Sequence, residues 1–127
     1  VNTLWQLETR TVTAVETKAG TWQVTLNVHA RKIVYDSAGV ETEMPMGELI
    51  PIGVFAEREP GHDELSVPLY FQNHRIRSGE QTITVTVTGK PVLGGIDPHH
   101  LLDWEEKEDD DNIEQVTIGH QSSVIGQ

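Results

Sequence analysis

The 127-residue chain has no cysteine. Disulfides, thiolate zinc sites and a cysteine nucleophile are therefore excluded, while the redox compartment stays open because reducing and oxidising environments both tolerate cysteine-free proteins. Basic residues are also few, since nine lysines and arginines stand against 20 acidic residues and give a formal net charge of −11. A field of this sign repels phosphate backbones, so we expect no nucleic-acid partner.

Long apolar runs are missing as well. No stretch approaches the roughly 20 residues of a membrane-spanning helix, and the N-terminal VNTLWQLETR lacks the basic, apolar and small-residue order of a signal peptide. We expect no direct membrane insertion by this chain. It begins at Val1 instead of a methionine, which we interpret as excision from a longer polypeptide whose other parts hold the localisation signals and the chemistry.

Alternation of period two dominates the sequence and is typical of strands with one buried face. Between residues 21 and 30 the apolar side chains fall on one face, namely Trp22, Val24, Leu26, Val28 and Ala30. An earlier alternating run at residues 9–16 is joined to this strand by Lys18-Ala19-Gly20, which predicts a hairpin. A second hairpin is predicted around residues 36–39, where Asp and Gly suit a tight turn.

Further apolar or alternating runs at residues 49–56, 67–71 and 82–88 bring the expected number of strands to about seven. Turn residues separate these runs, and no amphipathic helical window is present. The sequence therefore predicts an all-β fold, an antiparallel two-sheet β-sandwich of immunoglobulin-like type around one core. Charge replaces alternation beyond Pro98, so we expect a sandwich domain at residues 1–103 and, at 104–127, an acidic C-terminal exit segment with a weakly ordered tail.

The segment GGIDPHHLLDWEEKEDDDN, residues 94–112, concentrates the candidate functional side chains. Its adjacent histidines, His99 and His100, lack the spacing of a zinc-peptidase helix, in which two imidazoles one turn apart meet the same ion. Neither a G-x-S-x-G elbow nor a glycine-rich phosphate loop occurs elsewhere in the chain. We expect no catalytic, cofactor-binding or metal site, and an enzyme built on His99, His100 and Asp103 is the weakest hypothesis.

The acidic run at residues 105–111 is a candidate calcium ligand set because calcium takes carboxylate oxygens, although the run lacks the glycine that bends an EF-hand loop. Repulsion among its carboxylates favours an extended, solvated segment unless a cation or a basic surface neutralises it. Trp104 lies beside this run and is free to dock on the sheet or on a neighbouring domain. The candidate interaction surface consists of Trp104, Asp97, His99, His100, Asp110, Asp111 and Asn112.

One longer block, residues 69–112, carries a family resemblance. It contains a His-x-Ile-x-Ser-Gly-Glu phrase, a strand, a proline, a small-residue pair, Ile-Asp-Pro and an Asp-Asp-Asn finish. This order resembles the C-terminal β-rich domain of bacterial proteins that fuse an ABC-transporter permease to an aminopeptidase N-like zinc-peptidase domain. The matching residues are His74, Ile76, Ser78, Gly79, Glu80, Pro91, Gly94, Gly95, Ile96, Asp97, Pro98, Asp103, Asp110, Asp111 and Asn112. The likeness covers roughly residues 8–112 and breaks at 104–108, where an acidic insertion replaces an arginine-containing link.

The resemblance implies a noncatalytic accessory domain for scaffolding or recognition, whose partner is the neighbouring peptidase-like domain of the parent chain. It places the catalytic zinc upstream, and it places this domain on the extracytoplasmic side of a bacterial membrane as part of a membrane-anchored parent. In this interpretation Ile96 fills the core at the exit of the domain, and Asp97 accepts backbone hydrogen bonds. The alternative is a stand-alone binding module for carbohydrate, peptide or calcium that uses Trp104, Tyr70 and the acids of residues 105–112.

Overall fold

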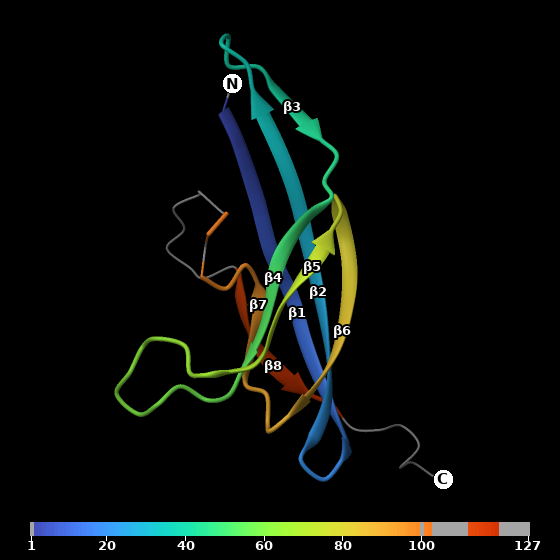
Figure 1. Ribbon diagram of the computed structural model, residues 1–127, viewed down its shortest axis with the longest axis vertical. Coiled ribbons are helices and arrows are strands. Elements are labelled where there is room, and N and C mark those ends of the chain that lie inside the picture. Colours follow the sequence, from blue (N-terminus) through green and yellow to red (C-terminus); the bar gives the residue numbers. More distant parts are fainter. Residues whose placement is uncertain (1, 100, 103–111, 120–127) are drawn as a thin grey trace.

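The computed structural model describes residues 2–99, 101–102 and 112–119, which form eight strands and no helix (Figure 1). The strands are β1 (Asn2–Lys18), β2 (Thr21–Tyr35), β3 (Glu41–Met44), β4 (Glu48–Phe55), β5 (Pro68–Ile76), β6 (Gly79–Thr88), β7 (Leu93–Ile96) and β8 (Ile113–Ile118). The all-β prediction is confirmed. Within the described residues, no helix has the length and apolar character needed to cross a membrane.

All eight strands belong to one curled sheet. Seven of them follow the order β3-β2-β1-β8-β7-β4-β5, and β6 lies beside β3 on the edge of β2 that faces away from β1. β1 and β8 run parallel, whereas the other neighbours are antiparallel. The prediction of two antiparallel sheets was wrong, because one mixed sheet curls into a half-barrel (Figure 1). An immunoglobulin-like sandwich is not confirmed.

The C-terminal part of the described chain also departs from expectation. β8 lies between β1 and β7 and pairs with both, so residues 112–119 are part of the same sheet. The boundary expected at residue 103 therefore does not separate a complete β domain from an exit segment and tail. Removal of β8 would leave unpaired backbone groups in the middle of the sheet, where each buried unpaired group is costly.

The two predicted hairpins are present. β1 and β2 pair from Asn2 with Tyr35 to Lys18 with Thr21, and Gly20 makes the turn with a φ of 79°. At the second turn, the Asp36 side chain accepts hydrogen bonds from two backbone amides at 2.9 Å, those of Ala38 and Val40. These contacts are the local bonds that favour Asp at the start of a turn.

The main core lies inside the curl and joins both halves of the sheet. The side chains that alternate inward from β2 meet those from β4 and β6, and the buried residues include Trp22, Val24, Leu26, Val28, Ile50, Ile52, Val54, Val85 and Val87. Each fully buried aliphatic side chain of this kind contributes about 1.5–3 kcal/mol through the hydrophobic effect. This core fixes how β4 and β5 lie against β1 and β2.

A second, smaller cluster lies on the opposite, outer face of the sheet. It consists of Phe55, Leu93 and Ile113, with Leu65 and Val92 packed against it. Phe55 and Leu93 are cross-strand partners, so they project from the same face, away from the inward-facing Ile52 and Val54. The β4–β5 loop covers this end of the outer face through Leu65.

Candidate functional site

The chain turns sharply after β7, and Asp97 controls this turn. Its φ of 46° is the left-handed conformation that non-glycine residues rarely adopt and that Asp tolerates better than most. The Asp97 carboxylate accepts hydrogen bonds from the amides of Leu101 at 3.0 Å and Leu102 at 2.8 Å. The prediction that Asp97 accepts backbone donors is confirmed, and so is the burial of Ile96, which is 0% exposed.

Asn112 holds the other side of this turn, just before β8. Its side-chain Nδ2 donates to the Ile96 carbonyl at 2.8 Å. The Thr9 hydroxyl donates to the Asn112 carbonyl at 2.8 Å and accepts from the Ile96 amide at 3.0 Å. We call Thr9, Asp97 and Asn112 the latch, because together they tie β1, the end of β7 and the start of β8.

The latch corrects part of the predicted interaction surface. Asp97 and Asn112 are each 0% exposed, so neither side chain lies on the surface. Asn112 is buried because its carbonyl oxygen fills the space beside Gly95, where an added Cβ would lie only 1.5 Å away. The sequence signal for this role was the glycine pair at 94–95, which permits close approach of another backbone.

Of the other five residues of the predicted interaction surface, the structure describes only His99. His99 is exposed, and its ring centroid lies 5.6 Å from that of Phe71 and 6.3 Å from that of Phe55. His99 therefore lies against side chains of β4 and β5, beside the second cluster. Four predicted residues fall outside the described part of the chain, namely His100, Trp104, Asp110 and Asp111.

The contacts of His99 point to an exposed strip of the sheet. Cross-strand pairs place Leu49 beside Arg75, Pro51 beside Asn73 and Gly53 beside Phe71. By alternation these residues project away from the main core, and we call Leu49, Pro51, Phe71, Asn73 and Arg75 the outer face of β4–β5. Leu49 is 53% exposed and Phe71 is 37% exposed.

The outer face of β4–β5 carries no acidic side chain. Residues 49–56 and 65–78 contain no Asp or Glu, in a chain with 20 acidic residues. The second run includes Arg75 and Arg77, and the Arg75 guanidinium donates to the Gly47 carbonyl. The sequence predicts only apolar runs at these positions, and the absence of acids does not single them out, because residues 17–35 and 81–96 also contain no Asp or Glu.

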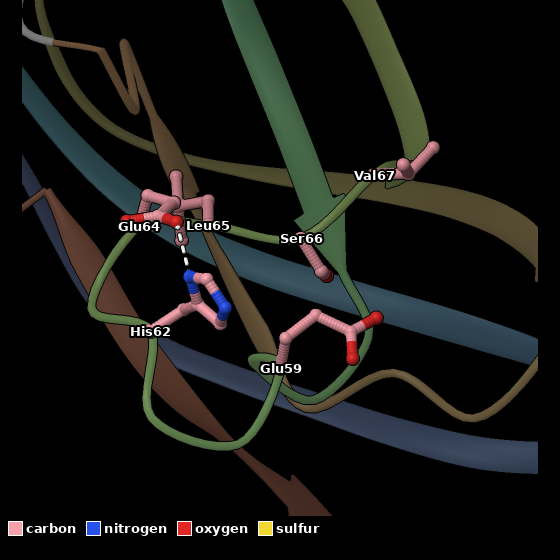
Figure 2. A pocket seen from close by; sticks show the side chains of 6 residues that line it. All are labelled: Glu59, His62, Glu64, Leu65, Ser66 and Val67. Carbon is pink, nitrogen blue, oxygen red and sulfur yellow. Dashed lines mark hydrogen bonds and ion pairs between the residues drawn. The ribbon is translucent and has the colours of Figure 1, made fainter.

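The loop between β4 and β5 encloses a hollow of about 250 Å³ (Figure 2). It is lined by Glu59, His62, Glu64, Leu65, Ser66 and Val67. The His62 ring nitrogen Nδ1 lies 2.8 Å from the Glu64 carboxylate, and the Ser66 hydroxyl donates to the Ala56 carbonyl at 3.0 Å. Across residues 2–99, 101–102 and 112–119, no group of three or more His, Asp or Glu side chains is arranged to hold a metal ion.

The opposite end of β4 has one strongly shifted carboxyl group. Glu48 accepts hydrogen bonds from the Gly47 amide at 2.8 Å and the Trp5 indole at 2.8 Å, and its carboxylate lies 3.1 Å from the Lys32 ammonium. Partial burial alone would raise the pKa of Glu48, but these donors and the charge of Lys32 outweigh it and lower the pKa to about 2. This network fixes the start of β4 to β1 and β2.

Comparison with known proteins gives no match. No family model, no curated protein and no solved structure is similar to this chain.

Proposed function

We propose that this chain is a noncatalytic accessory domain that binds a neighbouring protein domain through the outer face of β4–β5. The observation that carries the proposal is the exposed apolar strip at Leu49 and Phe71, free of acidic side chains in a protein of net charge −11. Exposed apolar strips rimmed by polar groups are typical of interaction surfaces. The resemblance supplies the candidate partner, the zinc-peptidase-like domain of a bacterial membrane-associated fusion protein, on the extracytoplasmic side.

Packing supports a preformed binding surface. The strip continues directly from the buried second cluster, because the His99 ring contacts both buried Phe55 and exposed Phe71. Beneath it, Gly53 is buried against the Phe55 ring and Pro98. A surface held by such a core loses little conformational entropy on binding, which favours affinity.

The test is binding between this chain and a separately produced zinc-peptidase-like domain from a fusion protein of the resembling family, measured by titration calorimetry. Phe71→Glu would place a charge on the strip at the end beside His99 and is expected to weaken binding at least tenfold. The matched control is Thr84→Glu, an exposed strand position on β6, which should change affinity less than twofold. Absence of binding by the wild-type chain, or equal effects of the two variants, would refute the proposal.

Catalysis is tested separately. The chain alone is expected to release no product from aminopeptidase substrates such as amino-acid p-nitroanilides, with or without added zinc. Zinc-dependent turnover by the purified chain that disappears on chelation would contradict a noncatalytic role.

A second candidate function is a stand-alone binding module for peptide, carbohydrate or calcium, and the hollow in Figure 2 supports it. Its mixture of carboxylates with Leu65 and Val67 suits a basic side chain with an aliphatic stem. Calorimetric titration with a lysine-containing peptide, a glycan panel and calcium would test this function. Saturable binding that is lost in Glu64→Gln would favour the module, whereas no heat with any of these ligands would argue against it.

A further inference from the structure

β5 is the last strand in the order of the sheet, and among the described residues no strand pairs with its outer edge. Successive residues of a strand direct their N–H and C=O groups to opposite edges, so alternate residues of the nine in β5 direct theirs away from β4. A row of unpaired backbone groups is a template for another strand. This edge adjoins the outer face of β4–β5.

β3 and β6 together form the other lateral edge of the half-barrel (Figure 1), and β6 differs chemically from β5. Its exposed side chains are Glu80 and four threonines, and Thr82 bonds within the sheet. The Thr82 hydroxyl donates to Asn27 at 2.7 Å, and the Asn27 amide donates to the Thr11 hydroxyl at 2.8 Å. A strand added at β6 would meet threonine hydroxyls and the Glu80 carboxylate, whereas one added at β5 would meet Phe71 and no acidic side chain.

The inner side of the β5 edge offers a second set of contacts. Tyr70 and His74 lie four residues apart on the same face of β5, and the Tyr70 hydroxyl is 2.6 Å from His74 Nε2. Tyr70 also packs against the main core, as does Ile83 of β6. The side chains of an added strand would therefore alternate between Phe71 on the outer side and the Tyr70–His74 pair on the inner side.

The charge near the end of β5 also restricts which side chains the added strand carries. Residues 65–78 include Arg75 and Arg77 and no acidic residue. Arg77 comes directly after Ile76, the last residue of β5. An acidic side chain in the added strand would be attracted to this end of the edge.

We infer that the partner binds by strand addition: an extended segment with apolar residues at alternate positions and at least one Asp or Glu pairs with the free edge of β5. This inference rests on the proposed function and specifies its mode of recognition. Main-chain hydrogen bonds supply much of the affinity in such complexes, and the alternating side chains supply the specificity.

Amide hydrogen exchange, read residue by residue by NMR, tests the inference in the chain with and without the zinc-peptidase-like domain described above. We expect alternate amides of β5, those that do not bond to β4, to exchange at least tenfold more slowly in the complex. Amides of β6 should be unchanged. Arg77→Glu should weaken binding at least fivefold, whereas the control Lys90→Glu, an exposed residue outside the strands, should change it less than twofold.

The outcomes separate this inference from the proposed function. Absence of any complex would refute both. Binding that is lost in Phe71→Glu but brings no new protection to β5 would leave the proposed function intact and overturn strand addition. Concentration-dependent protection of β5 in the chain alone would identify a second copy as the occupant and overturn the assignment to a different domain.

Discussion

Gly95→Ala is the substitution for which the structure makes the sharpest prediction. A Cβ at this position would lie 1.5 Å from the Asn112 carbonyl oxygen and 2.7 Å from the Asn112 carbonyl carbon. Both atoms are backbone, so no rotation of a flexible side chain can relieve the overlap. Restoring an ordinary contact above 3 Å requires β7 and the start of β8 to separate by roughly 1.5–2 Å.

The magnitude follows from the bonds that such a shift would break. The Thr9 hydroxyl to Asn112 carbonyl bond and the Asn112 amide to Ile96 carbonyl bond are both buried and 2.8 Å long. Each contributes about 1 kcal/mol, and leaving buried groups unpaired costs about 1–3 kcal/mol more. We expect Gly95→Ala to lower the free energy of unfolding by about 3–5 kcal/mol, a large share of the 5–15 kcal/mol typical of a domain.

Urea unfolding followed by tryptophan fluorescence measures this loss. With a urea m-value of about 1.5 kcal/mol per molar, the midpoint should fall by about 2 M or more. The matched control is Gly47→Ala, because a Cβ at the exposed Gly47 would meet nothing within 4 Å and the φ of Gly47 is not positive. The free energy of unfolding of Gly47→Ala should stay within about 0.5 kcal/mol of wild type. Equal midpoints for the two variants would refute the account of the latch.

Two further predictions concern charge. The fall in the pKa of Glu48 from 4.5 to about 2 corresponds to at most about 3.4 kcal/mol, and partial exposure reduces this to about 1–2 kcal/mol. This stabilisation is present above pH 4.5 and is lost as the pH falls towards 2. The urea midpoint of Glu48→Gln should therefore lie below that of wild type at pH 7 and converge with it near pH 2. A difference between the two midpoints that does not change with pH would contradict this prediction. Asn112→Asp replaces a buried donor by a carboxylate beside buried Asp97 and should lower the free energy of unfolding by about 3 kcal/mol at pH 7 in the same assay. The exposed control Asn73→Asp should stay within about 0.5 kcal/mol of wild type. Equal losses in the two variants would show that burial of the charge is not the cause.

Local features of the fold could be predicted from the sequence because they depend on neighbouring residues. The buried face of β2, the turn at Asp36 and the backbone bonds to Asp97 all follow from alternation or from a short side chain that bonds its own backbone. The single sheet could not be predicted in this way. β1 has 17 residues and β2 has 15, and alternation within such strands does not show whether they bend to join two halves of one sheet.

The place of β8 in the sheet and the burial of Asn112 could not be predicted, for a different reason. The strand is six residues long and pairs in parallel with β1, more than 90 positions earlier in the chain, so no local turn signals its place. Asn112 follows an acidic run in the sequence and was grouped with it by composition. Its role depends on the space beside Gly95, which exists only once β7 and β8 are aligned. The outer face of β4–β5 could not be predicted because it combines side chains from two strands that lie apart in the sequence.

The bend in β1 connects the latch to the proposed binding surface. A register shift lies between Thr9 and Thr11, and across it the buried positions change from odd numbers, Leu7 and Thr9, to even numbers, Val12 and Ala14. This β-bulge directs the Thr9 hydroxyl inward to Ile96 and Asn112, while the pairing of β1 with β8 begins at Val12. The bulge, the latch and the insertion of β8 therefore depend on one another. Because β7 is fixed by this arrangement and pairs directly with β4, loosening the latch should reduce affinity at the outer face of β4–β5 even though the latch residues themselves are buried.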